Sequence, residues 1–411
     1  MNVTPHFESG QFAGETRGVH IARKSNRYRR GRRRELAIWW REIDRVLLGI
    51  VAALMIAGII AVAAGSAASA ERLSTARKTL PDLYFFWPHV RWLVLGAGVM
   101  AATSMMPRDL ARRFAIVLAA VMLALLVLVP FVGAEVNGAR RWINVGASFQ
   151  PSEFYKPAFA LALAWILSWK VRDPGLPVIA ASGALLLLSV GLLMLQPDFG
   201  AAMLLCGVWF VLVLCAGMPW RHIGLAVGAI GSIVGLAYMF YDNARHRIDA
   251  FLEGGEAFSQ VDLASKTMLS GGWFGRGLWM GERKNSLPEA HTDYILSVIG
   301  EEFGLVSVAA ISLLFCALVV RVLWRLRDED DLFAVLGGTG LAALLGGQAF
   351  INIAVNLQLF PSKGMTLPLI SYGGSSMIAL CLSIGLLLAV TRRNPYLGRD
   401  GFNALQGRRR T

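Results

Sequence analysis

Hydrophobic residues along this chain gather into windows of about 20 residues, separated by polar stretches. A helix of about 20 apolar residues crosses the hydrocarbon core of a bilayer. The pattern therefore predicts an all-α, polytopic integral membrane protein with about ten transmembrane helices. The windows lie near residues 43–66, 86–106, 113–133, 153–170, 175–196, 200–218, 223–242, 294–323, 331–359 and 370–391. Those at 294–323 and 331–359 exceed the thickness of a bilayer, which predicts tilt or turns outside the membrane.

Composition supports the membrane assignment. Hydrophobic residues make up 55% of the 411 residues and charged residues only 16%, whereas soluble proteins carry about a quarter charged residues. The first 40 residues are polar and basic and lack the apolar core and cleavage site of a signal peptide. We expect three parts: a basic cytoplasmic tail (1–42), a membrane domain (43–395) and a cytoplasmic C-terminal tail (396–411).

The net charge of +13 is concentrated in part before the first apolar window, in the basic run at 23–34. Such a run suits either nucleic acid or anionic lipid. Its position beside a membrane span favours membrane lipids as the partner, and no nucleic acid is expected. Basic residues in alternate loops predict that both termini are cytoplasmic.

Several cations nevertheless fall on the predicted outer side, among them Arg140, Arg141 and Lys363. They run against the usual charge bias of membrane proteins, and an anionic ligand outside would explain them. The longest outer loop, about 243–292, includes a glycine-rich stretch at 270–279. Its spacing is not that of a P-loop, so a flexible interfacial loop is favoured over a phosphate cradle.

The four cysteines, Cys206, Cys215, Cys316 and Cys381, all lie in apolar windows and show no C-x-x-C spacing. This pattern favours packing over a disulfide or a metal site.

The strongest candidate site is Asp293, at the outer end of the window that begins near residue 294. A lone acid there is usually a helix cap, but Glu289 and His291 precede it, which favours a functional site. Glu301 and Glu302 follow two to three turns into the span, where ionisable groups are costly and must face protein or a wet cavity.

The faces of this helix rank its acids. On a continuous helix, Asp293, Ser297, Gly300 and Gly304 share one face. Glu301 lies about 80° from that face and Glu302 opposite it. Glu301 is therefore the better candidate for tuning a cavity at Asp293, although a structural role is open for both glutamates.

Three further stretches place polar groups on the outer side. Glu153 and Lys156 lie one turn apart at a predicted helix start, as a structural ion pair or with Lys156 turned to a phosphate. Asp198 would cap the next helix or point into the same outer cavity. The stretch at 360–376, with Lys363 and Ser371, is rich in Pro and Gly, which at membrane depth requires protein or a cavity around it.

Four of these motifs, taken in order, resemble the SEDS family (shape, elongation, division and sporulation). The motifs lie at 288–293, 299–304, 363–368 and 370–376, and the resemblance extends over about residues 43–395. The stretch at 363–366 is more similar to division-type than to elongation-type members. Residues 260–266 depart from the family pattern, so loop contacts there do not transfer.

The resemblance implies a peptidoglycan glycosyltransferase of the bacterial inner membrane, at the division septum and with its active site facing the periplasm. It implies lipid II as substrate, with a class B penicillin-binding transpeptidase and divisome regulatory proteins as partners. The family's catalytic acid falls on Asp293, as the general base. Lys156, Arg140, Arg141 and Lys363 would then neutralise the diphosphate, with Glu153, His291 and Ser371 near the headgroup and Glu289, Glu301 and Asp198 tuning the cavity. A divalent cation, Mg²⁺ or Mn²⁺, would share that duty, although no ligand spacing demonstrates a metal site.

Three alternatives remain open at this level. A lipid II flippase would also have many spans, buried acids and outer cations, but transport favours charges distributed through the membrane, and here they gather at the outer edge. An elongation-type polymerase would share the chemistry. A scaffold that recruits the transpeptidase, with weak activity of its own, is the third.

Overall fold

The computed structural model describes residues 36–74, 79–136, 139–144, 148–173, 175–217, 220–241, 245, 248–249, 260–361 and 364–392. The chain divides into two compact units, one formed by Asp44–Thr391 and the other by Met1–Ile43 with Arg392–Thr411. The long helices and the candidate site lie in the unit Asp44–Thr391. The basic run at 23–34, Lys363 and residues 393–411 lie outside the described residues.

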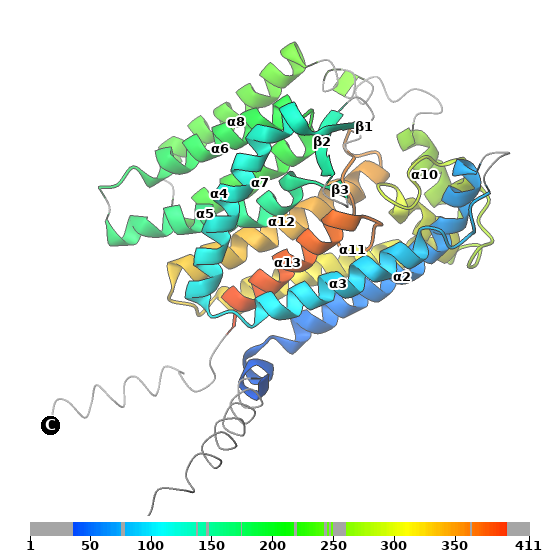
Figure 1. Ribbon diagram of the computed structural model, residues 1–411, viewed down its shortest axis with the longest axis horizontal. Helices are drawn as coiled ribbons and strands as arrows, with labels where there is room; N and C mark the ends of the chain where they lie inside the picture. Colours follow the sequence, from blue (N-terminus) through cyan, green and yellow to red (C-terminus); the bar gives the residue numbers. More distant parts are fainter. Residues whose placement is uncertain are drawn as a thin grey trace, which may run out of the picture. The chain divides into compact units, whose positions relative to one another are not determined.

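Each apolar window contains one long helix (Figure 1). In chain order they are α2 (Arg45–Leu73), α3 (Phe86–Ser104), α4 (Arg108–Val132), α5 (Pro151–Arg172), α6 (Val178–Leu195), α7 (Phe199–Cys215), α8 (Trp220–Phe240), α11 (Ile295–Leu326), α12 (Leu332–Asn356) and α13 (Gly374–Val390). The predicted helical architecture is confirmed, because a helix satisfies its own backbone hydrogen bonds in lipid. Among the described residues, five of these helices, α2, α4, α6, α11 and α12, are long and apolar enough to cross a membrane. The number of crossings and the side of the termini stay predictions.

Helix starts follow local sequence signals. Asp44 caps α2, accepting hydrogen bonds from the N–H groups of Val46 and Leu47 at 3.0 and 3.1 Å. Asp331 caps α12 in the same way, and Pro151 occupies the first turn of α5, where its missing N–H costs nothing.

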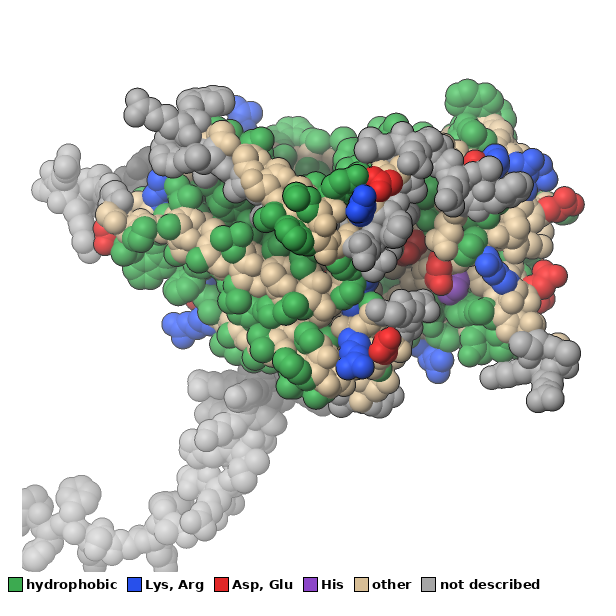
Figure 2. Space-filling model, turned by 90° about the horizontal axis from the view of Figure 1, so that it is seen from above, with side chains coloured by type: hydrophobic (Ala, Val, Ile, Leu, Met, Phe, Trp, Pro, Cys, Tyr) green, Lys and Arg blue, Asp and Glu red, His purple; other side chains and the backbone are tan. Residues whose placement is uncertain are grey.

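α12 is the central helix. Of its apolar window 67% is buried, against 28–39% for the other four candidate spans. Glycines on α12 permit this close packing, because a Cβ added at Gly337 would lie 2.9 Å from Leu161 of α5. Figure 1 shows α12 flanked by α5, α11 and α13, with α2 and α3 along one side. Hydrophobic side chains are spread over the face in Figure 2, and charged ones gather mainly toward the end where α10 (Gln260–Ser270) lies.

A small antiparallel sheet joins α4 to α5, which the hydrophobic pattern did not predict. Its strands are β1 (Ala134–Val136), β2 (Ala139–Asn144) and β3 (Ser148–Phe149), in the order β1-β2-β3. Strands this short, in a polar connection, carry too little alternation to be recognised.

The long loop is folded rather than flexible where it is described. It contains α10 and the 3₁₀ helix η1 (Arg283–Ser286). Ala264, Leu287 and Ala290 of this loop are buried in one cluster with Ala64 of α2 and Val298 of α11. The loop therefore packs on the membrane helices, and its last residues lead directly to Asp293.

α11 is broken at Gly304, which contradicts the expectation of one continuous helix. Gly304 has φ 81° and ψ 172°, a conformation open chiefly to glycine. At the break, the N–H groups of Leu305 and Val306 donate to the carbonyls of Gly272 and Trp273 at 2.9 and 3.2 Å. The glycine-rich loop thus supplies the hydrogen bonds that the helix loses.

Candidate active site

Asp293 lies just before α11, on the loop that precedes Ile295, and is half-buried. The sequence pattern placed Asp293 on one helix face with Gly304. Because Asp293 precedes α11 and the helix is broken at Gly304, that shared face does not exist. Asp293 borders a pocket with Gly364, whose backbone comes so close that an added Cβ would lie 3.4 Å from the Asp293 Oδ2 atom. The other lining residues are Tyr294, Ile351, Asn352, Val355 and Met365.

The main chain at this position is held at three consecutive carbonyls. The N–H of Tyr372 donates to the carbonyl of His291 at 2.9 Å, and the hydroxyl of Ser371 donates to that of Thr292 at 2.7 Å. The carbonyl of Asp293 accepts from the amide of Asn352 at 2.9 Å. The predicted residue Ser371 therefore lies next to Asp293 in space and positions its backbone.

His291 is nearly buried in an aromatic cluster. Its ring stacks on Phe85 with centroids 4.0 Å apart, and its Nδ1 atom lies 2.8 Å from the Ser69 hydroxyl. Burial lowers the pKa of His291 to about 4, against a weaker opposing effect of the Glu289 charge. His291 is therefore a neutral side chain at physiological pH, while Glu289 is exposed and accepts a hydrogen bond from Thr292 at 2.7 Å.

Glu301 and Glu302 both bind the long loop. The Glu301 carboxylate is fully buried and accepts the backbone N–H groups of Glu282, Arg283 and Lys284 at 2.8–3.1 Å. Glu302 forms a buried ion pair with Lys284, whose ammonium also donates to the Ala64 carbonyl at 3.1 Å. These contacts give both glutamates a structural task at η1, and the cavity-tuning role of Glu301 stays a prediction.

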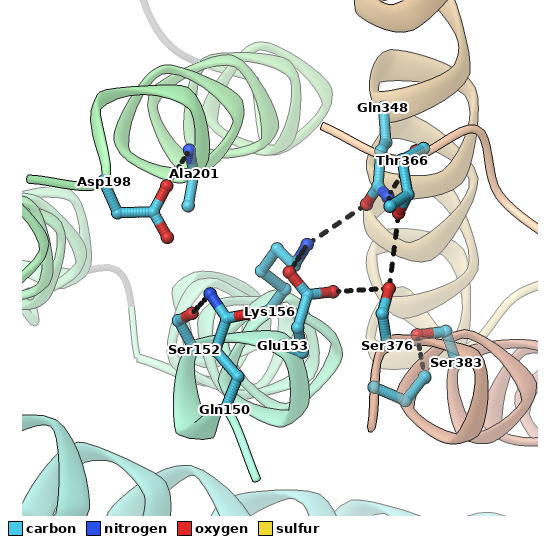
Figure 3. Close-up of polar contacts among 11 residues, drawn as sticks. Gln150, Ser152, Glu153, Lys156, Asp198, Ala201, Gln348, Thr366, Ser376 and Ser383 are labelled. Atoms are coloured by element: carbon cyan, nitrogen blue, oxygen red, sulfur yellow. Dashed lines mark hydrogen bonds and ion pairs between the residues drawn. The ribbon is translucent and has the colours of Figure 1, made fainter. Parts of the chain in front are cut away.

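Lys156 and Glu153 form a buried ion pair of 2.8 Å on the first turns of α5. The Lys156 ammonium also donates to Gln348 of α12 at 3.2 Å, and the other carboxylate oxygen of Glu153 accepts from Ser376 of α13 at 3.2 Å. Figure 3 shows these side chains pointing toward one another from three helices. Lys156 is 4% exposed, so its charge is compensated inside the protein.

The remaining predicted residues have structural partners. Asp198 caps α7 by accepting from the N–H of Ala201 at 3.2 Å (Figure 3). The guanidinium of Arg141 donates to the carbonyls of Gln196 and Pro197. Arg140 is exposed and lies 3.4 Å from Glu135 across the β1–β2 pair. Their roles toward a substrate stay predictions.

Sequence reasoning missed three amide side chains on α12: Gln348, Asn352 and Asn356. They contact the Lys156 ammonium, the Asp293 carbonyl and the Ser297 hydroxyl respectively. A signal was available, because polar residues four apart within an apolar window share one helix face and are costly in lipid.

No ligand spacing in the sequence demonstrated the divalent cation expected at the diphosphate. Within the described ranges, no three His, Cys, Asp or Glu residues are grouped so that they would hold an ion. The participation of a cation stays a prediction.

Comparison with known proteins identifies the family to which this chain belongs. The family model of cell cycle proteins of the FtsW, RodA and SpoVE type matches residues 44–396. A probable peptidoglycan glycosyltransferase FtsW from Caulobacter vibrioides is 37% identical over 372 residues, which cover 88% of this chain and 93% of that protein. One of the same name from Aromatoleum aromaticum is 36% identical and covers 85% of this chain and 88% of its own.

Solved structures agree. A chain from work on the structural coordination of polymerization and crosslinking by a peptidoglycan synthase complex is 31% identical, with a TM-score of 0.69, and covers 85% of this chain and 97% of its own. The rod shape determining protein RodA of Thermus thermophilus is 31% identical, with a TM-score of 0.65 and coverage of 87% and 99%. With its apolar helices, the chain is a multi-pass membrane protein, and it belongs to the FtsW, RodA and SpoVE family.

Proposed function

We propose that this protein is a peptidoglycan glycosyltransferase that polymerises lipid II during septal cell-wall synthesis, with Asp293 as general base. The observation that carries the proposal is the placement of Asp293. Its carboxylate borders a pocket beside Gly364, and its backbone is fixed by donors from α12 and the segment before α13. The relatives named as probable peptidoglycan glycosyltransferases support the reaction class.

In this reaction Asp293 accepts the proton of the acceptor sugar's 4-hydroxyl while that oxygen bonds to the anomeric carbon of the donor. The bond from that carbon to the diphosphate oxygen breaks, the carbon inverts, and the polyprenyl diphosphate leaves. A positioned base of this kind contributes about 10²–10⁴-fold to the rate. His291, neutral at working pH, adds no second charge beside the carboxylate.

The departing diphosphate needs compensating charge. Lys156 and Arg141 are already engaged with Glu153 and with backbone carbonyls, so either would have to exchange a partner to bind it. Arg140 is exposed, and Lys363 lies outside the described residues. A divalent cation bound there would supply further positive charge to the diphosphate.

Location and partners extend the proposal. We place the active site on the periplasmic side of the inner membrane at the septum, with a class B penicillin-binding transpeptidase and divisome regulators as partners. The structural match to a chain from work on a peptidoglycan synthase complex supports assembly with such a transpeptidase.

The test uses purified full-length protein with a class B transpeptidase and lipid II. We expect Asp293→Asn to lower glycan formation about 10²–10⁴-fold. The control is Asp173→Asn, which alters an exposed acid at the C-terminal end of α5. This variant should retain full activity. Equal activity of the two variants would remove Asp293 as base. Failure of the wild type to form glycan, together with passage of labelled lipid II across vesicle membranes, would favour the transporter.

A further inference from the structure

Three amide side chains form a stripe along α12. Gln348, Asn352 and Asn356 are spaced four residues apart and are 1%, 2% and 0% exposed. At that spacing they follow one face of the helix. A buried amide is costly unless its donors and acceptors are paired. The hydrogen-bond partners of these three side chains therefore indicate what the stripe does.

Asn352 joins two segments that are distant in sequence. Its side-chain N–H₂ donates to the carbonyl of Asp293 at 2.9 Å and to that of Met365 at 2.6 Å. Asn356 supports the first of these bonds, since its own N–H₂ lies 3.2 Å from the Asp293 carbonyl. The Asn356 oxygen accepts from Ser297 at 2.7 Å. The stripe thus holds the backbone on both sides of the pocket.

Gln348 extends the stripe to the ion pair on α5. Its N–H₂ donates to the carbonyl of Thr366 at 3.0 Å, next in the chain to Met365, and its oxygen accepts from the Lys156 ammonium at 3.2 Å. Figure 3 shows Gln348 between Lys156 and Thr366. The Thr366 hydroxyl lies 3.3 Å from that of Ser376, which donates to Glu153.

We propose that Gln348 and Asn352, with Asn356 behind them, are positioning residues that hold Asp293 and Lys156 in one fixed arrangement through the Gly364–Thr366 segment. The inference rests on the proposed glycosyl transfer. A base must sit within hydrogen-bond reach of the acceptor hydroxyl, and a misplacement of about 1 Å can cost about 100-fold in rate. In this proposal none of the three amides contacts the reacting atoms.

A purely structural role predicts something different. If the stripe only stabilised the packing of α12, Asn352→Leu would lower the thermal midpoint, because the carbonyls of Asp293 and Met365 would lose their donor. Protein that stays folded would then keep its kcat.

The test compares Asn352→Leu and Gln348→Met with Phe350→Leu, a control on the same helix whose side chain is 68% exposed. We expect both stripe variants to lower kcat for glycan formation at least tenfold. The KM for lipid II should stay within about twofold, and the loss of kcat should persist in folded protein assayed well below the thermal midpoint of each variant. Turnover of the folded stripe variants equal to that of the control would overturn the proposal.

Hydrogen–deuterium exchange provides a readout that needs no activity. In Asn352→Leu we expect faster exchange in peptides covering residues 288–294 and 364–372, with exchange along α2 unchanged. Unchanged exchange in both peptides would refute the positioning role. If the wild type forms no glycan, the proposed function fails, and exchange alone decides whether the stripe holds the Asp293 segment.

Discussion

At Asp293 the side chain and the main chain have different neighbours. A Cβ added at Gly364 would lie 3.4 Å from the Asp293 Oδ2 atom, whereas the Asp293 carbonyl is bound by Asn352. The preceding residue, Thr292, is bound by Ser371 in the same way. Hydrogen bonds to consecutive main-chain carbonyls fix where the Asp293 side chain starts, and such fixed placement is what the proposed general base requires.

His291 allows a pH prediction at this scale. Its pKa falls from 6.5 to about 4 on folding, so the folded and unfolded states are both neutral above about pH 6.5. Below that pH the unfolded chain binds a proton that the folded chain refuses. Stability is therefore lost as pH falls from about 6.5 to about 4, by about 3 kcal/mol in all.

The measurement is the thermal midpoint of detergent-solubilised protein between pH 7 and pH 4. We expect the wild type to lose more stability over this interval than His291→Gln, which has no ring to protonate. Parallel curves for the two proteins would show that burial of the imidazole does not penalise its charged form.

At the scale of elements, the break in α11 is where the glycine-rich stretch of the long loop packs against a membrane helix. The break falls where residues 271–277 lie against the helix, and the N–H groups of Arg276 and Gly277 donate to the carbonyls of Glu301 and Glu302 at 3.0 Å. Backbone meets backbone there because a Cβ at Gly271 or Gly275 would lie 2.1 Å from a carbonyl oxygen of α11. The glycine-rich stretch is thus a packing surface for the helix.

Replacement of Gly304 tests this packing. Gly304→Ala places a side chain at φ 81° and a Cβ 2.2 Å from the Trp273 carbonyl, so we expect a loss of several kcal/mol from strain and overpacking together. Gly98→Ala is the control, because Gly98 lies in α3 with nothing within 4 Å of its Cβ position. The control should be neutral or slightly stabilising. Similar thermal midpoints for the two variants would contradict the contact.

At the scale of the whole membrane unit, ion pairs with buried carboxylates join elements that are far apart in the chain. Asp44 at the start of α2 pairs with Arg321 at 2.8 Å and Arg325 at 3.3 Å near the end of α11. Lys284 of η1 pairs with Glu302 of α11 and reaches the Ala64 carbonyl of α2. α2 and α11 are therefore linked at two levels, and the second link also anchors the loop that ends at Asp293.

Loss of the second link should be costly. Lys284→Met leaves the buried Glu302 charge unpaired, for which we expect a destabilisation of about 3–5 kcal/mol. Lys284→Met combined with Glu302→Met removes both charges and should recover much of that loss. Lys266→Met, in a pair whose lysine is 54% exposed, should change stability by less than about 1 kcal/mol. Chemical denaturation of the three variants measures these differences, and equal effects at Lys284 and Lys266 would argue against a buried pair.

Much of the fold was predictable from the chain alone, because lipid imposes a simple rule. A segment of about 20 apolar residues must form a helix to satisfy its backbone, so the windows located the long helices to within a few residues. Asp293 was singled out as well, since an acid at the end of such a window stands out, and its catalytic role stays a prediction.

Tertiary structure decided which polar groups meet. Gln348, Asn352 and Asn356 look like minor interruptions of an apolar window, and only packing of α12 against the segments at 291–293 and 364–366 makes them hydrogen-bond partners of the site. The break at Gly304 likewise depends on a loop about 30 residues earlier in the chain. Hydrophobicity is a local property that each window carries by itself, whereas a hydrogen bond between distant segments requires the folded arrangement of both partners.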